Sequence, residues 1–238
     1  MANQVTLGDL KARALDRADM TNSSFIETAR LRDYLNAGGS ELYNILVRVY
    51  GDDYFFKKDT IVTVANQEEY NLPPDFYKLT ALWLVLGSGN NTQRRELKRF
   101  MYSDVGTDHD HSLSLSTQLP RYRLTQNNLF LFPKPDGGKT IEFWYVPQYQ
   151  KMIADTDSVN LGIPTLPNGW EEYLVVWAAI KCLEKEESDT RDLKQDLADL
   201  RSQFINTAPD RDTKEGERVV DVSRRFDGRP GHLLNLLR

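Results

Sequence analysis

The chain has 238 residues, of which 27% are charged and 40% hydrophobic, and a formal net charge of −5. This length allows one domain with a hydrophobic core, or one domain plus arms. No apolar run approaches the about 18 residues of a membrane span, and no signal peptide is visible, so we expect folding in the cytoplasm. The acidic balance argues against tight duplex binding, because phosphate-neutralising proteins are usually basic on at least one face.

The chain opens with a predicted helix. Thr6 and Asp9 have the spacing of a capping box, in which each residue bonds the backbone of the other. Apolar residues at Leu7, Leu10 and Ala14 then recur at helical intervals.

A second helical pattern is predicted to begin at Ser24, with Glu27 three residues on, and to end at Gly51. Gly38 and Gly39 interrupt this pattern. Because each glycine in a helix costs about 1 kcal/mol relative to alanine, we expect a break or kink there, giving two helices or one bent one. Residues 1–55 are thus predicted to be the N-terminal helices of a bundle.

The middle third, residues 56–150, predicts an antiparallel β meander or small sandwich. β-branched or alternating apolar residues indicate strands at 60–64, 78–86, 122–124, 129–132 and 140–146. The last strand places Ile141, Phe143 and Tyr145 on one face. Residues 94–103 are interpreted as a short helix, and 103–118 as a polar loop.

The strongest helical signal lies in residues 151–208. Asn168 is a candidate cap for a helix that reaches about Glu187. Another helix begins at Ser188 or Asp189, with leucines spaced by three and four residues before Phe204. The short connection predicts an antiparallel helix pair.

Residues 209–238 have no helical or strand periodicity of comparable length and are predicted to form an extended C-terminal arm. Its last part, 222–238, holds four arginines against the single acidic residue Asp227. Leucines near the end are costly to leave in water, so we expect this segment to fold on binding to another polypeptide. The alternative is an arm that folds back on its own domain or stays disordered. The candidate partner-binding residues are Arg224, Arg225, Phe226, Arg229, Leu233, Leu234, Leu236 and Leu237.

No catalytic motif is visible, and we expect no catalysis, cofactor or metal. Asp108–His111 holds metal-ligand side chains, but no second Cys or His group exists to complete a shell, so a solvated loop is favoured. The acidic run Glu184–Asp189 is interpreted as a solvated helix–helix turn. Cys182 lies in an apolar helical pattern and is predicted to be a small core residue.

Several segments, in their order along the chain, resemble the head-to-tail adaptors (connectors) of tailed bacteriophages. The segments lie at 50–55, 70–79, 122–133, 143–147 and 169–187, and the resemblance covers residues 5 to 215. It implies a ring, commonly of twelve copies, docked under a portal, with a helical layer and a β domain facing the tail. In related adaptors an extended C-terminal arm reaches the portal or a neighbouring subunit.

The resemblance further implies a structural protein of the virion neck that joins capsid to tail and lets the genome pass. Its partners are then the portal protein, a tail or nozzle protein and other copies of itself, with no membrane and no sequence-specific DNA contact. A predominantly acidic body suits such a conduit, because it repels phosphates. One alternative is a tail-completion, stopper or tail-tube protein. Another is a nucleic-acid-binding or hydrolytic accessory factor, which requires a basic face or a metal.

Overall fold

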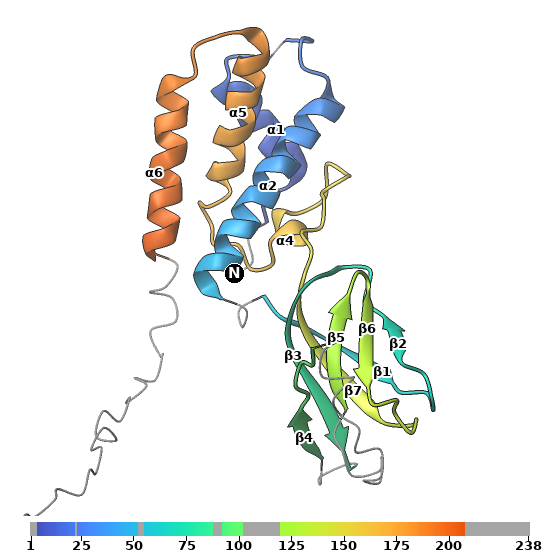
Figure 1. Ribbon diagram of the computed structural model, residues 1–238. Helices are drawn as coiled ribbons and strands as arrows, with labels where there is room; N and C mark the ends of the chain where they lie inside the picture. The colour runs from blue at the N-terminus through green and yellow to red at the C-terminus, as the bar shows by residue number, and fades with distance from the viewer. Residues whose placement is uncertain (1–3, 22, 52–54, 88–91, 102–119, 208–238) are drawn as a thin grey trace, which may run out of the picture.

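The computed structural model describes residues 4–21, 23–51, 55–87, 92–101 and 120–207. It confirms the α+β class: helices from both ends of the described chain form one part, and strands from the middle form another (Figure 1). The helices are α1 (Leu7–Arg17), α2 (Thr28–Tyr50), α4 (Val159–Gly162), α5 (Glu172–Glu186) and α6 (Arg191–Thr207). The predicted arm and the polar loop at 103–118 lie outside the described residues.

The first helix begins as the sequence predicts. The Asp9 amide donates to Thr6 Oγ1 at 3.2 Å, and the Thr6 amide donates to Asp9 Oδ2 at 3.0 Å. Both bonds satisfy amides that lack a partner at a helix start. The backbone and side-chain bonds from Thr6 lower the pKa of Asp9 below its usual range.

The predicted start of α2 at Ser24 is wrong: the helix begins at Thr28, with Glu27 as its N-cap residue. Ser23 accepts a hydrogen bond from the Phe25 amide at 3.1 Å, so the serines form a turn before the helix. Of the two alternatives predicted at Gly38 and Gly39, two separate helices are wrong, since α2 runs unbroken for 23 residues to Tyr50 and ends at Gly51, as predicted.

The α5–α6 pair is confirmed, with the two helices side by side and joined by a short turn (Figure 1). The predicted cap at Asn168 is wrong, because the N-cap residue of α5 is Glu171. Glu171 Oε2 accepts from the Gly169 amide at 2.7 Å, and Gly169 has φ +93, so the chain turns at this point instead. The four-residue helix α4 was not predicted.

Two antiparallel sheets form the middle part. One has the order β1-β7-β3-β4 and the other β2-β6-β5. The strands are β1 (Lys57–Val62), β2 (Glu69–Asn71), β3 (Phe76–Leu86), β4 (Gln93–Glu96), β5 (Arg121–Thr125), β6 (Asn128–Phe132) and β7 (Thr140–Pro147). Buried residues of both sheets share one cluster that includes Leu84, Leu131 and Phe143, so the arrangement is the small sandwich and not the meander.

The helix predicted at 94–103 is wrong as far as the described residues reach. β4 pairs with β3, placing Glu96 opposite Trp83, and Tyr122 donates a backbone hydrogen bond to Lys98 at 2.9 Å. Leu97 and Phe100 are buried, as a helical pattern would also require. The spacing of three residues thus predicts correctly that both side chains are buried, but it predicts the wrong backbone conformation.

The helices enclose a separate cluster, to which α1, α2, α5 and α6 all contribute. The two clusters share no buried residue. The two parts have separate cores, although Val146 at the end of β7 packs in the helical cluster and Tyr77 of β3 donates to Asn44 of α2.

Candidate functional site

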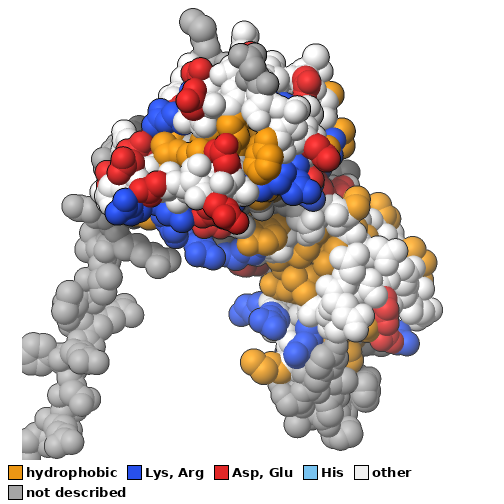
Figure 2. Space-filling model, turned by 90° about the horizontal axis from the view of Figure 1, so that it is seen from above, with side chains coloured by type: hydrophobic (Ala, Val, Ile, Leu, Met, Phe, Trp, Pro, Cys, Tyr) orange, Lys and Arg blue, Asp and Glu red, His pale blue; other side chains and the backbone are white. Residues whose placement is uncertain are grey.

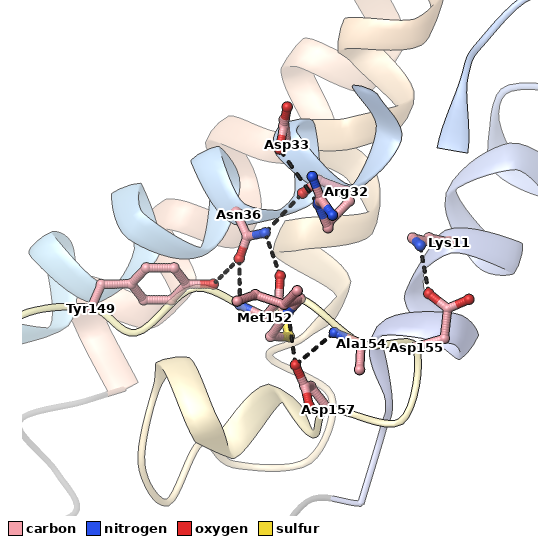
Figure 3. A network of polar contacts seen from close by, with 10 residues as sticks. Lys11, Arg32, Asp33, Asn36, Tyr149, Met152, Ala154, Asp155 and Asp157 are labelled. Carbon is pink, nitrogen blue, oxygen red and sulfur yellow. Dashed lines mark hydrogen bonds and ion pairs between the residues drawn. The ribbon is translucent and has the colours of Figure 1, made fainter. Parts of the chain in front are cut away.

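Asn36 ties α2 to the segment that leaves the sandwich after β7 (Figure 3). Its side chain is 6% exposed. Asn36 Nδ2 donates to the carbonyls of Met152 at 2.9 Å and Arg32 at 3.1 Å, and its Oδ1 accepts from the Met152 amide at 2.9 Å. The Tyr149 hydroxyl donates to the same Oδ1 at 3.2 Å. Every hydrogen-bonding position of this buried amide is therefore used to hold residues 149–152 against the helix.

Glycines of α2 and α4 make room for two aromatic rings, one of them in the same segment. A Cβ on Gly39 would collide with the Tyr149 hydroxyl, and one on Gly162 would collide with the Tyr149 ring. A Cβ on Gly38 would lie 2.9 Å from Cγ of Trp177, which belongs to α5. The glycine pair therefore serves close packing of two aromatic rings, and this packing offsets its low helix propensity.

Two tyrosine hydroxyls donate hydrogen bonds close to the place where the helical part joins the sandwich. The Tyr43 hydroxyl donates to the Pro147 carbonyl at 2.7 Å, and burial raises the pKa of Tyr43 to about 12. The Tyr145 hydroxyl donates to Asp75 Oδ1 at 2.8 Å, and Lys57 Nζ lies 2.7 Å from Asp75 Oδ2. Partial burial acts to raise the pKa of Asp75, but the bonds from Lys57 and Tyr145 outweigh it and lower that pKa. Together with Asn36 and its glycines, these contacts form what we call the joint.

Beyond the joint, residues 153–157 form a loop that packs against α1 (Figure 3). Asp157 Oδ2 accepts from the amides of Ile153 at 2.7 Å and Ala154 at 2.8 Å. Lys11 Nζ lies 2.5 Å from Asp155 Oδ1, and the Leu7 amide donates to the Asp157 carbonyl at 2.8 Å. We call this segment the Ile153 loop, because it presents Ile153 with 72% of its surface exposed.

The outer face of the four-stranded sheet carries aromatic side chains. Phe56 stacks on Trp144 with ring centroids 5.4 Å apart, and Trp83 lies 6.0 Å beyond. Lys58 Nζ lies 4.3 Å from the Trp144 ring centroid, a favourable cation–π distance. Phe56 is 42% exposed. Apolar groups gathered on an outer sheet face are typical of a contact surface.

Ion pairs join three helices on another side of the molecule. Arg13 lies 2.6 Å from Glu172, and Arg17 lies 3.3 Å from Glu172 and 3.0 Å from Asp196. These pairs connect α1 with both helices of the C-terminal pair. Both arginine side chains are about 40% exposed, so water weakens each ion pair. We therefore infer that the network orients α6 more than it stabilises the fold.

Acidic side chains of the run at the α5–α6 turn form ion pairs with nearby lysine and arginine side chains. Glu184 accepts from Lys181 at 2.8 Å and lies 2.9 Å from Lys194, and these two bonds lower its pKa. Asp189 pairs with Arg191 at 2.6 Å. Cys182 is fully buried, and burial raises the pKa of its thiol to about 11, so this thiol is unreactive at neutral pH.

Charge is divided between the two parts. Residues 151–207 carry 11 acidic and 6 basic side chains, whereas the described residues from 55 to 150 carry 7 acidic and 11 basic ones. The expected acidic body is thus a property of the C-terminal helices, and the sandwich is basic. Figure 2 shows Lys and Arg side chains on the surface near the place where the helical part meets the sandwich.

The predicted partner-binding residues, Arg224 to Leu237, lie outside the described residues, as does Asp108–His111. Within the described ranges, no group of three or more metal-ligand side chains forms. The helices described here also lack the length and apolar content that crossing a bilayer requires. The sequence alone does not reveal the joint: Gly38 and Gly39 are its signal, but their low helix propensity indicates a helix break instead.

A helical layer that is locked to a small sandwich, with contact surfaces on both, suits an assembly subunit better than an active site. The sequence profile of the SU10 adaptor protein family matches residues 5–224. The chain belongs to this family. The match confirms the predicted resemblance to bacteriophage head-to-tail adaptors and extends nine residues past the range in which we saw it. No curated protein sequence matches the chain.

Family membership supports a structural component of a virion that contacts other head or tail proteins. The match ends at Arg224, so of the eight predicted arm residues only Arg224 falls within it. The joint, the Ile153 loop and the aromatic sheet face all lie inside the matched range.

Proposed function

We propose that this SU10-family adaptor is a subunit of a ring that sits under the portal, joins capsid to tail and lets the genome pass. The observation that carries the proposal is the family match over residues 5–224. The fold supports it, because the joint bonds α2 to the segment that leaves the sandwich through a buried asparagine. Such bonds tie together the two parts of a subunit that contacts two other assemblies.

In this proposal each part has its own role. Residues 1–55 and 151–208 form the helical layer, 56–150 form the β domain facing the tail, and 209–238 form an arm that reaches the portal or a neighbouring copy. The leucines at 233, 234, 236 and 237 provide its apolar anchor, and the arginines at 224, 225 and 229 pair with carboxylates of the partner. The 11 acidic side chains of residues 151–207 favour this part for the wall that repels DNA.

The alternative within the virion is a tail-completion, stopper or tail-tube protein. The α5–α6 pair disfavours it, because a helix pair packed on α1 and α2 suits a helical adaptor layer better than a mostly-β tube.

The test is to mix the purified chain with its cognate portal protein and to measure mass and ring symmetry by mass photometry and electron microscopy. We expect rings, commonly of twelve copies, on the portal. Deleting residues 222–238 should abolish docking, and the matched control replaces only Asp227 by Asn. Rings that dock equally well without the segment would contradict the arm's role, and a chain that stays monomeric beside the portal would contradict the adaptor function.

A further inference from the structure

Asn168 takes part in none of the contacts described above. It is exposed, it does not cap α5, and no described residue forms a hydrogen bond with its side chain. Gly169 follows it, and this is the only Asn-Gly pair in the sequence. Because glycine has no side chain to shield its backbone nitrogen, that nitrogen can approach the preceding asparagine side chain closely. The pair is therefore a candidate for spontaneous chemical modification.

The reaction requires only the chain and water. The Gly169 nitrogen loses its proton to hydroxide and attacks Cγ of Asn168. The new N–Cγ bond closes a succinimide ring, and the Cγ–Nδ2 bond breaks as Nδ2 takes a proton from water and leaves as ammonia. Water then opens either carbonyl of the ring. One product is aspartate, and the other is isoaspartate, in which the backbone runs through the side chain and is longer by a methylene group.

The backbone around the pair forms a turn that opposes this attack. The Trp170 amide donates to the Pro167 carbonyl at 3.2 Å, and Gly169 has φ +93, as the third residue of a type II turn requires. In this turn type the second residue, here Asn168, has ψ of about +120°, which points the Gly169 nitrogen away from the Asn168 side chain. The turn must therefore open before the ring can close.

Glu171 holds the attacking nitrogen. The Gly169 amide donates to Glu171 Oε2 at 2.7 Å, and Glu171 is 6% exposed. Arg13 Nη1 of α1 lies 3.5 Å from the other carboxylate oxygen. The bond from Gly169 must break before the nitrogen can turn, and the negative carboxylate disfavours a second negative charge on that nitrogen. Glu171 therefore slows the reaction in two ways.

The same turn positions a contact between α5 and α6. Trp170 lies just before α5, and its ring stacks on Phe204 of α6 with ring centroids 4.6 Å apart. Phe204 is the buried residue of α6, with 2% of its surface exposed. An isoaspartate at position 168 lengthens the backbone that places Trp170. Because close-packed rings tolerate little displacement, this change weakens the packing of the end of α6.

We propose that Asn168 is a spontaneous deamidation site whose rate is set by Glu171, and that its isoaspartate product loosens the end of α6. Glu171 is a positioning residue in this reaction, since it acts through the Gly169 amide. The proposal goes beyond the adaptor function and does not depend on it. It describes how a subunit changes chemically with age, before or after it is assembled.

Peptide mass spectrometry of the full-length chain tests the site. After incubation in mildly alkaline buffer, we expect Asn168 to convert to a mixture of aspartate and isoaspartate. In denaturant, where neither the turn nor the Glu171 bond forms, conversion should be at least about tenfold faster, because a hydrogen bond to a charged group contributes about that factor. No conversion in the folded chain would overturn the modification site, and equal rates in the folded and denatured chains would overturn the restraint.

Substitutions at two adjacent glutamates isolate the role of Glu171. Glu171→Ala should raise the rate in the folded chain by about tenfold, and Glu171→Gln, whose carbonyl can still accept from the Gly169 amide, should give a smaller rise. The matched control, Glu172→Ala, removes ion pairs with Arg13 and Arg17 but leaves the Gly169 bond, and should change the rate less than about twofold. Equal acceleration by the two alanine variants would indicate general loosening of α5 and overturn the role of Glu171.

Hydrogen exchange tests the effect on α6. The isoaspartate form, separated from the aged chain by ion-exchange chromatography, should lose amide protection around Phe204, whereas the middle of α2 should keep its own. Asn168→Asp is the control, because it carries the new charge without the longer backbone, and it should retain the protection of α6. Unchanged protection in the isoaspartate form, or an equal loss in Asn168→Asp, would overturn the proposed effect of the longer backbone.

Discussion

The helical part and the sandwich differ in how they use polar and aromatic groups. In the helical part a buried amide, Asn36, is fully hydrogen-bonded, and aromatic rings such as Tyr149 fill spaces left by glycines. In the sandwich the aromatic residues Phe56, Trp83 and Trp144 lie on an outer sheet face beside cations. The comparison indicates that the helical part provides the rigid frame, whereas the sandwich exposes surface that a partner can cover.

The largest expected effect comes from the sandwich core. Phe143→Ala should lower the free energy of unfolding by about 3–5 kcal/mol, because Phe143 is fully buried between the two sheets. Hydrogen exchange should show lost protection in β7 while α5 keeps its own, since the two clusters share no buried residue. Phe56→Ala on the outer face is the control, with an expected loss of less than about 1 kcal/mol. Equal loss of protection in α5 would show that the two parts unfold together.

The joint gives the next largest effect. Asn36→Ala should cost about 2–4 kcal/mol, because the buried amide and carbonyl of Met152 both lose their partner. Chemical denaturation measures the loss. Asn44→Ala, on the same helix but in an open groove, should cost less than about 0.5 kcal/mol. If the two variants were equally stable, the joint would not be the frame that we describe.

The glycine packing can be tested by a double-mutant cycle. Gly39→Ala should cost about 1–3 kcal/mol, because the added methyl group meets the Tyr149 hydroxyl. In a Tyr149→Phe background, which lacks that hydroxyl, the same substitution should cost less. An unchanged penalty would show that the hydroxyl is not the cause, and would leave the ring carbons Cζ and Cε2, 2.8 and 3.0 Å from the added Cβ, as the contact.

The smallest expected effect is a change in the Ile153 loop at low pH. Backbone bonds from Ile153 and Ala154 lower the pKa of Asp157 below its usual value of 3.8. The folded pKa is thus depressed, so this contribution to stability is fully present above about pH 4 and is lost as pH falls through the lowered pKa. Amide chemical shifts of Ile153 and Ala154 should therefore change only below pH 4. In Asp157→Asn, whose side chain cannot titrate, these shifts should stay constant over the same range.

Local patterns in the sequence decided a large share of the fold. The capping box at Thr6 and Asp9 and the alternation of Ile141, Phe143 and Tyr145 each depend on residues a few positions apart. Their physical causes are local hydrogen bonds and side-chain periodicity, which a sequence displays directly. The ordered set of such patterns was also sufficient to place the chain among the phage adaptors.

Contacts between distant residues decided the rest. Gly38 and Gly39 look like a helix break until Trp177 and Tyr149, more than 100 residues away, are packed against them. Residues 93–96 become a strand because β3 supplies its partner, and Asn36 becomes a structural amide only when Met152 reaches it. Propensity ranks what a segment prefers alone, whereas burial and hydrogen bonding to remote segments determine what it adopts in the folded chain.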